Sequence, residues 1–377
     1  MKIEKFFAEI RKINVQTITG VPDSTLQVFC DYLRNENVEF IDHIVAANEG
    51  AAVGIAIGEY LASGRPACVY LQNSGLGNVV NPVTSLANEE VYNIPILFIV
   101  GWRGEPGIKD EPQHKFMGKV TLPILDLLQI QWDVIDRATT ELELNEIFER
   151  AKSRLDNNHS YAIVVKKSTF DLFDTCKYEN TFSLVREDAI STIVEWMQKS
   201  DIVVSTTGKI SRELYEQSDR IKGNHRQTFL TVGGMGHADM IAYQIARRKS
   251  DRCVICLDGD GALLMHMGSM AVIGQNPVKN FIHICINNEV HESVGGMPTG
   301  ASGMRFSRVA RTIGYKRVYE VYTKEELSNV LSKVREEKEM VFIEILVSVE
   351  SRTDLGRPKE TAEENKRQFM QYHGVEK

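Results

Sequence analysis

The feature that most constrains this chain is Gly259-Asp260-Gly261, which ends one apolar run, while a second apolar run ends on Asn287-Asn288. Both runs read as strands, and the stretch between them suits a helix. Strands joined in this way end on the same edge of a parallel sheet, so Asp260 and an asparagine are expected to lie close together. Carboxylate and amide oxygens suit magnesium, and a helix opening at Ala262 offers backbone N–H groups to a diphosphate. A helix cap at Asp260 and a turn at the asparagines explain the same residues equally well.

The overall totals describe an ordinary globular protein. The 377 residues suit two domains, since a typical domain has roughly 150 to 200 residues. The chain has 51 acidic and 44 basic residues, a net charge of −7, and no long block of one sign. This balance argues against a general nucleic-acid binder and gives no sign of a membrane surface.

Targeting and redox signals are weak. No apolar run reaches the roughly 20 residues of a membrane-spanning helix, and the start of the chain lacks the apolar core of a signal peptide, so we expect a cytoplasmic protein. Cys253 and Cys256 have the spacing of a redox or zinc pair. Within one strand, however, they point to opposite faces, so we expect neither use.

Strands and helices alternate along both halves of the chain, which predicts an α/β protein with two doubly wound parallel-sheet domains. Residues 168–184 lose this periodicity. The expected division is a first domain at 1–168, a linker at 169–184 and a second domain at 185–377. A helix is expected to follow the strand at Val15–Val21, with Asp23 or Ser24 as its N-cap.

Three side chains in the first half are candidates for proton transfer. Glu49 follows a strand and stands among small residues, so it is either a first-turn acid favoured by the helix dipole or a buried carboxyl with a raised pKa. Asp23 is either a cap or an acid–base group. His114 follows a polar loop at residues 103–113, where a surface histidine is the ordinary alternative.

Taken together, the motifs resemble the thiamine diphosphate-dependent phosphonopyruvate decarboxylase family. The triplet at 259–261, the 25 residues from 262 to 286 and the asparagine pair are similar to the thiamine diphosphate motif, and Glu49 falls where those enzymes keep a glutamate. The following stretches are similar to the family: Gly20-Val21-Pro22-Asp23-Ser24, Asn73-Ser74-Gly75-Leu76-Gly77-Asn78, Asp110-Glu111-Pro112-Gln113-His114, Thr206-Thr207-Gly208-Lys209, His291-Glu292-Ser293-Val294-Gly295-Gly296 and Asp354-Leu355-Gly356-Arg357-Pro358.

The resemblance implies decarboxylation of a 2-oxo acid bearing a 3-phosphonate, with sulfopyruvate decarboxylases as the near alternative. It implies a pyrimidine-binding first domain, a diphosphate-binding second domain and no middle domain. It also implies a homo-oligomer, a dimer or larger, whose active sites lie between subunits. A non-catalytic cofactor-binding protein on the same fold is the alternative from another class.

The resemblance also implies residue roles. Glu49 would touch the cofactor ring, and Asp23 and His114 would guide the proton transfers that release the aldehyde. The magnesium ligands would be Asp260, Asn288 and the carbonyl of Val290. Further cofactor contacts would be Asn73, Thr207, Gly208, Gly234, Met235, Gly259, Gly261 and Ala262, and the substrate contacts would be His291, Arg352 and Arg357.

Two residues depart from the family pattern. Glu289 stands where glycine is expected after the asparagines, and Met297 stands where glutamine is expected. The first departure bears on the carbonyl of Val290 as a metal ligand, and the second bears on the substrate side of the site.

Overall fold

The computed structural model describes residues 1–34, 38, 40–173 and 178–375. It contains two compact units. One comprises Met1–Lys177 with Val294–Met297, and the other comprises Tyr178–Ser293 with Pro298–Lys377. The predicted linker includes residues 174–177, which lie outside the described residues, so its bounds remain a prediction.

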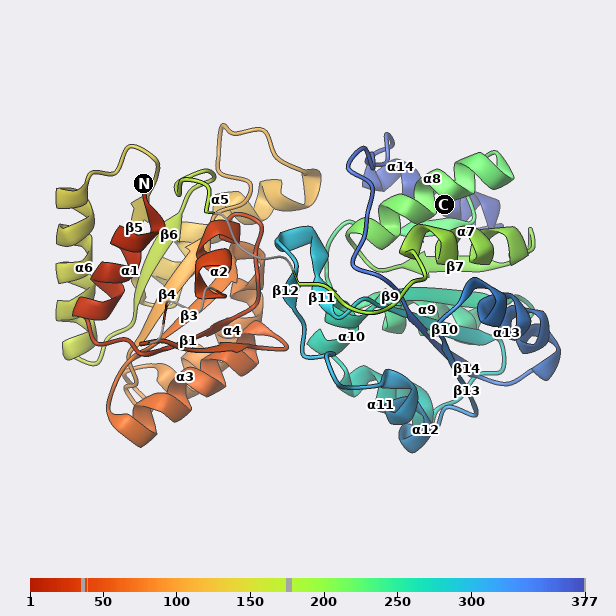
Figure 1. Ribbon diagram of the computed structural model, residues 1–377, viewed down its shortest axis with the longest axis horizontal. Coiled ribbons are helices and arrows are strands. Elements are labelled where there is room, and N and C mark those ends of the chain that lie inside the picture. The colour runs from red at the N-terminus through yellow and green to blue at the C-terminus, as the bar shows by residue number, and fades with distance from the viewer. Residues whose placement is uncertain (35–37, 39, 174–177, 376–377) are drawn as a thin grey trace. The chain divides into compact units, whose positions relative to one another are not determined.

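The first unit is a six-stranded parallel sheet with the strand order β2-β1-β3-β4-β6-β5 (Figure 1). Its strands are β1 (Thr17–Gly20), β2 (Asp42–Val45), β3 (Ala67–Gln72), β4 (Ile96–Gly101), β5 (Gln131–Ile135) and β6 (Tyr161–Val165). Its helices are α1 (Ile3–Lys12), α2 (Gln27–Leu33), α3 (Glu49–Ser63), α4 (Leu76–Pro82), α5 (Pro112–Leu127) and α6 (Glu141–Asp156), with short turns η1 (Asn73–Gly75) and η2 (Val83–Ala87).

Both faces of this sheet are covered. One face packs against α1, α2 and α6 through Phe6, Phe29 and Phe148. The other packs against α3, α4 and α5 through residues such as Val53 and Leu125. All residues of β4 and β6 are buried, as expected for strands with helices on both sides.

The second unit repeats this architecture with the strand order β13-β14-β10-β9-β7-β8. Its strands are β7 (Ile202–Ser205), β8 (Thr228–Leu230), β9 (Val254–Gly259), β10 (Phe281–Asn287), β13 (Arg317–Val321) and β14 (Val341–Leu346), with a small pair β11 (Val290–His291) and β12 (Met297–Pro298). Its helices are α7 (Arg186–Trp196), α8 (Lys209–Lys222), α9 (Ala238–Arg248), α10 (Asp260–Met265), α11 (Gly268–Gln275), α12 (Phe306–Ile313), α13 (Lys324–Glu337) and α14 (Ala362–Tyr372), with the turn η3 (Glu292–Val294).

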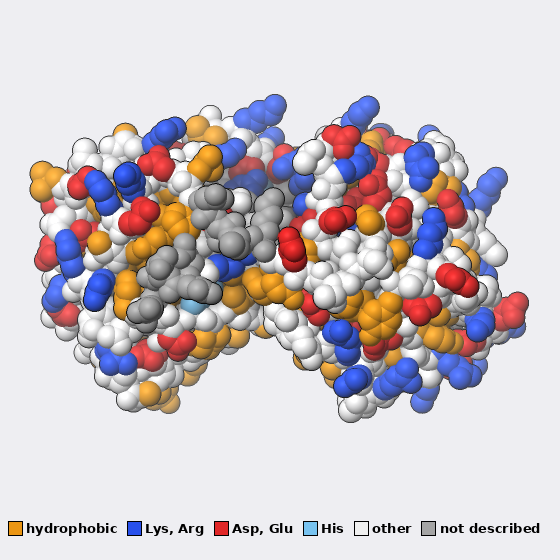
Figure 2. All heavy atoms as spheres, in the orientation of Figure 1, with side chains coloured by type: hydrophobic (Ala, Val, Ile, Leu, Met, Phe, Trp, Pro, Cys, Tyr) orange, Lys and Arg blue, Asp and Glu red, His pale blue; other side chains and the backbone are white. Residues whose placement is uncertain are grey.

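The second sheet is also covered on both faces. Helices α7, α8 and α13 pack on one face, and α9 to α12 pack on the other. The predicted α/β class with two doubly wound parallel sheets is confirmed. On the face shown in Figure 2, acidic and basic side chains are interspersed over each unit, matching the mixed charge of the sequence.

Several local predictions were incomplete or wrong. The sequence patterns did not predict α8, α9, α12 or β13. The predicted cap of α2 is also wrong, because the helix begins at Gln27 after Leu26, which makes no side-chain cap. Asp23 instead accepts the backbone N–H groups of Thr25 and Leu26, at 3.0 and 3.2 Å, in a turn that precedes the helix.

No helix in the part of the chain that the structure describes is long and apolar enough to cross a bilayer.

A glycine pair tests the packing. A Cβ on Gly274 of α11 would lie 2.0 Å from the carbonyl oxygen of Ile313, whereas a Cβ on Gly58 of α3 would meet nothing within 4 Å. Gly274→Ala should therefore lower the free energy of unfolding by about 2 kcal/mol. Gly58→Ala should raise it by up to about 1 kcal/mol, because alanine favours the helix. Urea denaturation of the two variants checks this, and shifts in the same direction would contradict the packing.

Candidate active site

The carboxyl ends of four neighbouring strands gather the glycine-rich loops of the second unit. In the sheet, β10, β9, β7 and β8 are consecutive, and β9 and β10 pair with Gly259 opposite Ile286. The loops that leave these strands are Asn288–Glu289, the start of α10, Thr206–Gly208 and Thr231–His237. Parallel pairing thus brings together on one edge the motifs that the sequence separates by up to about 80 residues.

Asp260 is the buried carboxylate of this edge. It begins α10, is 4% exposed, and accepts a hydrogen bond from the hydroxyl of Thr299 at 2.6 Å. Burial raises its pKa to about 7, and hydrogen bonds from Thr299 and from the backbone of Gly261 and Asn288 oppose that rise. The buried carboxylate therefore lies beside Asn288, as the spacing of the motif predicts.

The two asparagines, Asn287 and Asn288, have different hydrogen-bond partners. Asn287 donates to Glu344 of β14 at 2.9 Å and accepts from the backbone N–H of Glu289 at 3.0 Å. Both polar atoms of the Asn287 side chain therefore already have hydrogen-bond partners within the protein. Asn288 donates to Glu292 at 3.1 Å, and its oxygen accepts from the backbone of Val290 at 3.2 Å. An amide oxygen has two lone pairs, so the oxygen of Asn288 keeps one for a ligand.

Glu289 keeps the backbone turn for which the family pattern uses glycine. Its φ is +65°, in the left-handed region. Its side chain accepts from the hydroxyl of Tyr178 at 3.0 Å and pairs with Arg305 at 3.5 Å, while its carbonyl accepts from Thr299. The departure from glycine therefore preserves the turn that leads to Val290, because these contacts offset the strain.

Close contacts also fix the start of α10. A Cβ on Gly261 would lie 2.8 Å from the ring of His291, and a Cβ on Gly236 would lie 2.8 Å from the ring of His266. Gly236 also has a φ of +87°, which favours glycine, whereas a side chain at 261 would have to displace the ring of His291. His291 is half-buried, and its partial desolvation lowers its pKa to about 4, which keeps the ring neutral.

A network of buried charges supports the asparagine loop. Glu292 contacts Arg186, Lys209 at 2.8 Å and Asn288, and Arg186 also donates to Glu213 at 2.9 and 2.7 Å. Arg186 holds the pKa of Glu292 at about 2 against the opposing effect of burial. Lys209 begins α8 after Gly208, whose φ is +96°. The sequence patterns did not point to Arg186 or Glu213, because the pairing depends on how α7 and α8 pack.

In the first unit, Glu49 begins α3 and is 5% exposed. Its carboxylate accepts from Asn78 at 2.7 Å. A Cβ on Gly75 would lie 2.3 Å from its Oε1, so glycine at 75 makes room for it. Burial raises the pKa of Glu49, as expected for a carboxyl among small residues.

Asp23 is fully buried at the carboxyl ends of β1 and β4. A Cβ on Gly101 would lie 2.1 Å from its Oδ2, and its Oδ1 has no hydrogen-bond partner. Burial raises its pKa to about 6, although the charge of Arg103 lowers it. A group that titrates near neutrality is suited to proton transfer.

Arg103 is a candidate site residue that the sequence analysis missed. It lies just after β4, donates to Asp110 at 2.8 Å and to Ser24 at 2.9 Å, and its charge acts on Asp23. An arginine two residues after a buried strand, in a loop that also carries Asp110, was a usable signal. Asn73 holds this loop, because its amide exchanges two hydrogen bonds with the backbone of Arg103.

The other predicted residues have more ordinary surroundings. His114 is in the first turn of α5, and its carbonyl would lie 2.0 Å from a Cβ on Gly104. Arg352 pairs with Glu187, Glu216 and Asp354, and Arg357 is exposed. The structure thus balances the charge of Arg352 with carboxylates.

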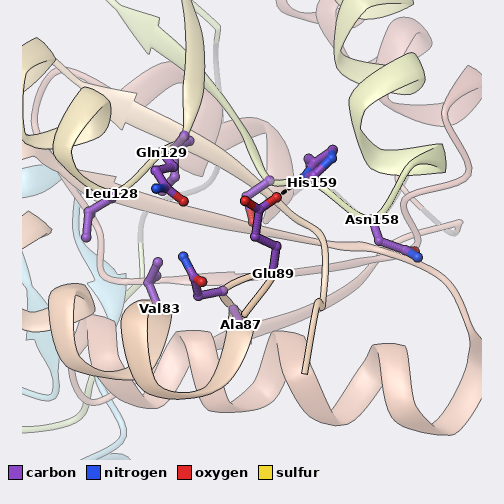
Figure 3. A pocket seen from close by; sticks show the side chains of 10 residues that line it. Val83, Ala87, Glu89, Leu128, Gln129, Asn158 and His159 are labelled. Atoms are coloured by element: carbon purple, nitrogen blue, oxygen red, sulfur yellow. Dashed lines mark ion pairs between the residues drawn. The ribbon is translucent and has the colours of Figure 1, made fainter. Parts of the chain in front are cut away.

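A hollow in the first unit, drawn in Figure 3, is lined in part by Val83, Glu89, Gln129 and His159. His159 pairs with Glu89 at 3.3 Å. The hollow is also lined by Ile130 and Ser160, which directly precede β5 and β6. The hollow therefore lies at the amino ends of these strands. It contains none of the predicted site residues, which supports the carboxyl edge as the functional one.

Comparison with known proteins agrees with this arrangement. The protein-family model described as "Thiamine pyrophosphate enzyme, N-terminal TPP binding domain" matches residues 2–123. The family model of the corresponding C-terminal TPP binding domain matches residues 207–345. Glu49 lies in the first match, and Asp260 and Asn288 lie in the second.

Two curated relatives match almost the whole chain. A phosphonopyruvate decarboxylase of Streptomyces viridochromogenes is 32% identical over 97% of this chain and 93% of its own. One from Streptomyces hygroscopicus is 31% identical over 97% of this chain and 92% of its own. The chain belongs to the phosphonopyruvate decarboxylase family of thiamine pyrophosphate enzymes. A sulfopyruvate decarboxylase of Methanosarcina acetivorans is 27% identical over 90% of this chain and 91% of its own.

The side chains of the second unit fit a magnesium-held diphosphate. A buried carboxylate, an amide oxygen with a remaining lone pair and the start of a helix meet at one edge, and hard oxygen donors are what magnesium prefers. Thiamine pyrophosphate, also called thiamine diphosphate, is thus the cofactor of this family member, and its two binding domains are present.

The buried charge of Asp260 predicts a pH effect on stability. Folding raises the pKa of Asp260 from 3.8 to about 7, so the metal-free chain takes up a proton on folding between these values, and its stability falls as pH rises through that window. In EDTA at about pH 8, Asp260→Asn should raise the free energy of unfolding by on the order of 2 kcal/mol. Near pH 4 the difference should largely vanish.

Urea denaturation at both pH values makes the measurement. Asp251→Asn is the matched control, because the Asp251 side chain is 77% exposed. Asp251→Asn should change the free energy of unfolding little at either pH. An equal loss of stability at both pH values in Asp260→Asn would contradict the buried-charge assignment.

Proposed function

We propose that this enzyme converts 3-phosphonopyruvate into phosphonoacetaldehyde and CO₂, with thiamine diphosphate held by Mg²⁺. The observation that carries the proposal is the similarity to a phosphonopyruvate decarboxylase over 97% of this chain and 93% of the relative. Similarity over both TPP-binding regions supports retention of the whole catalytic apparatus rather than of one binding module.

The second unit is proposed to bind the diphosphate and the metal. Asp260, the side chain of Asn288 and the carbonyl of Val290 would be the protein ligands of magnesium. Thr207, Gly208, Gly234, Gly259, Gly261 and Ala262 would contact the cofactor, and Met235 would support its bent shape. The buried contacts of Asn287 favour Asn288 as the ligand, because the amide of Asn287 already binds Glu344. His291, which lies against Gly261, is proposed to be near the substrate.

The first unit is proposed to manage protons. When bound, the cofactor supplies a nucleophilic carbon and an electron sink for the loss of CO₂. Glu49, whose pKa burial raises, would protonate a ring nitrogen. Asp23, with a pKa of about 6, would take or give a proton at its unpartnered Oδ1. His114 would assist release of the aldehyde, and Asn73 would hold the loop of Arg103 against the site.

The catalytic set is proposed to assemble between copies of the chain. Sulfopyruvate decarboxylases include separate alpha and beta subunits, and an alpha subunit matches 34% of this chain while a beta subunit matches 30%. Each of those subunits matches only about a third of this chain, and their names indicate enzymes built from more than one chain. We therefore propose a homodimer or larger oligomer. In it, Glu49 of one copy would contact the cofactor that Asp260 and Asn288 of another copy hold through the metal.

The substrate assignment makes a direct prediction. With Mg²⁺ and thiamine diphosphate, kcat/KM for 3-phosphonopyruvate should exceed the values for 3-sulfopyruvate and pyruvate by at least about tenfold, because substrate preference is a difference in transition-state binding. A coupled aldehyde reductase follows the product. A preference for 3-sulfopyruvate would contradict the substrate but keep the chemistry. Absence of cofactor-dependent aldehyde from all three acids would contradict both.

Glu49→Gln tests the proposed proton donor. The amide keeps the size of the side chain but cannot exchange the proton, so kcat should fall by at least about 100-fold. Binding of thiamine diphosphate, followed by tryptophan fluorescence, separates a chemical defect from loss of the cofactor. Glu59→Gln on the same helix is the control, since Glu59 pairs with Ser63 and Arg65, and its kcat should stay near wild type. Unchanged kcat in Glu49→Gln would remove Glu49 from the mechanism.

A further inference from the structure

Three different metal-ligating side chains converge inside the second unit. They are Cys256 and Asp258 of β9 and His283 of β10, and all three are at most 1% exposed. The sulfur, one carboxylate oxygen and one ring nitrogen lie within 4.8 Å of one another. Residues two apart on a strand share a face, and His283 is the direct cross-strand partner of Cys256, so the sheet itself aims these atoms at one point.

The atoms that face each other have no hydrogen-bond partner. Asp258 Oδ2 and His283 Nε2 are both buried and unpaired, although buried polar atoms are normally satisfied. They lie 3.5 Å apart, which is longer than the 2.7–3.2 Å of an ordinary N–H···O bond. Two such ligands of one tetrahedral zinc ion lie roughly 3.4 Å apart, given bonds of about 2.0–2.1 Å. The spacing thus fits a shared metal better than a hydrogen bond.

The surroundings orient each ligand. Asp258 Oδ1 accepts the backbone N–H of Gly259 at 2.9 Å, which leaves Oδ2 for the metal. His283 Nδ1 lies 3.0 Å from the hydroxyl of Tyr315, and metal-bound histidines commonly hydrogen-bond through the second ring nitrogen in this way. Asp239 of the covering helix α9 is also fully buried, and burial raises its pKa, although His283 opposes that rise. Its two carboxylate oxygens accept hydrogen bonds from the backbone N–H of Met240 and from the hydroxyl of Ser269, so Asp239 borders the three ligands without joining them.

We propose that Cys256, Asp258 and His283 bind a structural zinc ion in the core of the second unit. Binding displaces the thiol proton to solvent and gives a thiolate, a carboxylate and a neutral imidazole. The two negative charges balance Zn²⁺, so the site is neutral in a medium where a net charge is expensive. Sulfur and nitrogen donors select zinc over magnesium, so this site is distinct from the oxygen-donor edge at Asp260. It does not depend on the proposed substrate.

The test is the metal content of the full-length enzyme. Protein purified without a metal-affinity column and dialysed against metal-free buffer with Mg²⁺ added should retain about one zinc per chain by plasma mass spectrometry. Cys256→Ala and His283→Gln should lower that content at least about tenfold. Cys253→Ala should keep it, because Cys253 precedes β9 and is outside the cluster. Asp260→Ala should keep it too, which separates zinc from the magnesium edge.

A second measurement covers the case in which a core variant fails to fold. Wild-type protein produced with Co²⁺ in place of zinc should show the near-ultraviolet absorption of a thiolate bound to cobalt. If the wild-type protein holds less than about a tenth of one zinc per chain and its cobalt form shows no cobalt–thiolate band, the proposal is overturned. Asp258 and His283 would then be a buried pair without a metal. Zinc retained in Cys256→Ala at the wild-type level would also overturn it.

Discussion

The parallel pairing of β9 with β10 is the interaction on which the rest of the site depends. It sets Gly259 opposite Ile286, and so the first residue of α10 and the asparagines at the end of β10 meet at one edge of the sheet. The same pairing sets Cys256 beside His283 further down the strands. One register thus fixes both the oxygen-rich edge and the buried thiol–carboxylate–imidazole cluster, because a shift of one residue would turn both sets to the opposite face.

Several buried charged groups of the second unit have defined partners. Glu344 binds Asn287 and the backbone of Ser307, and Arg186 binds two glutamates. Asp260 is less well compensated, since its pKa is raised to about 7. A binding site that must accept a cation is expected to retain such an uncompensated carboxylate, at a cost to the stability of the metal-free chain.

Much of this arrangement was predictable from the sequence, and the failures have physical causes. The apolar runs predicted most strands, and motif spacing placed Asp260 beside an asparagine. Helices α8, α9 and α12 were missed although buried residues recur four positions apart in each of them, as at Ile210 and Leu214 of α8. The position of Arg103 just after a buried strand was a signal that the sequence analysis did not use, whereas its contacts with Ser24 and Asp110 depend on the folded loop. The spacing of Cys253 and Cys256 could not show that Cys256 lies beside Asp258 and His283, because His283 comes from a neighbouring strand.

The most direct test of the account is the position of the divalent metal in the loaded enzyme. Crystals grown with thiamine diphosphate and Mn²⁺ in place of Mg²⁺ give an anomalous signal that locates the ion. The account predicts a peak bound by a carboxylate oxygen of Asp260 and the amide oxygen of Asn288, with Asn287 still on Glu344. A peak bound by Asn287, or one away from Asp260, would contradict it.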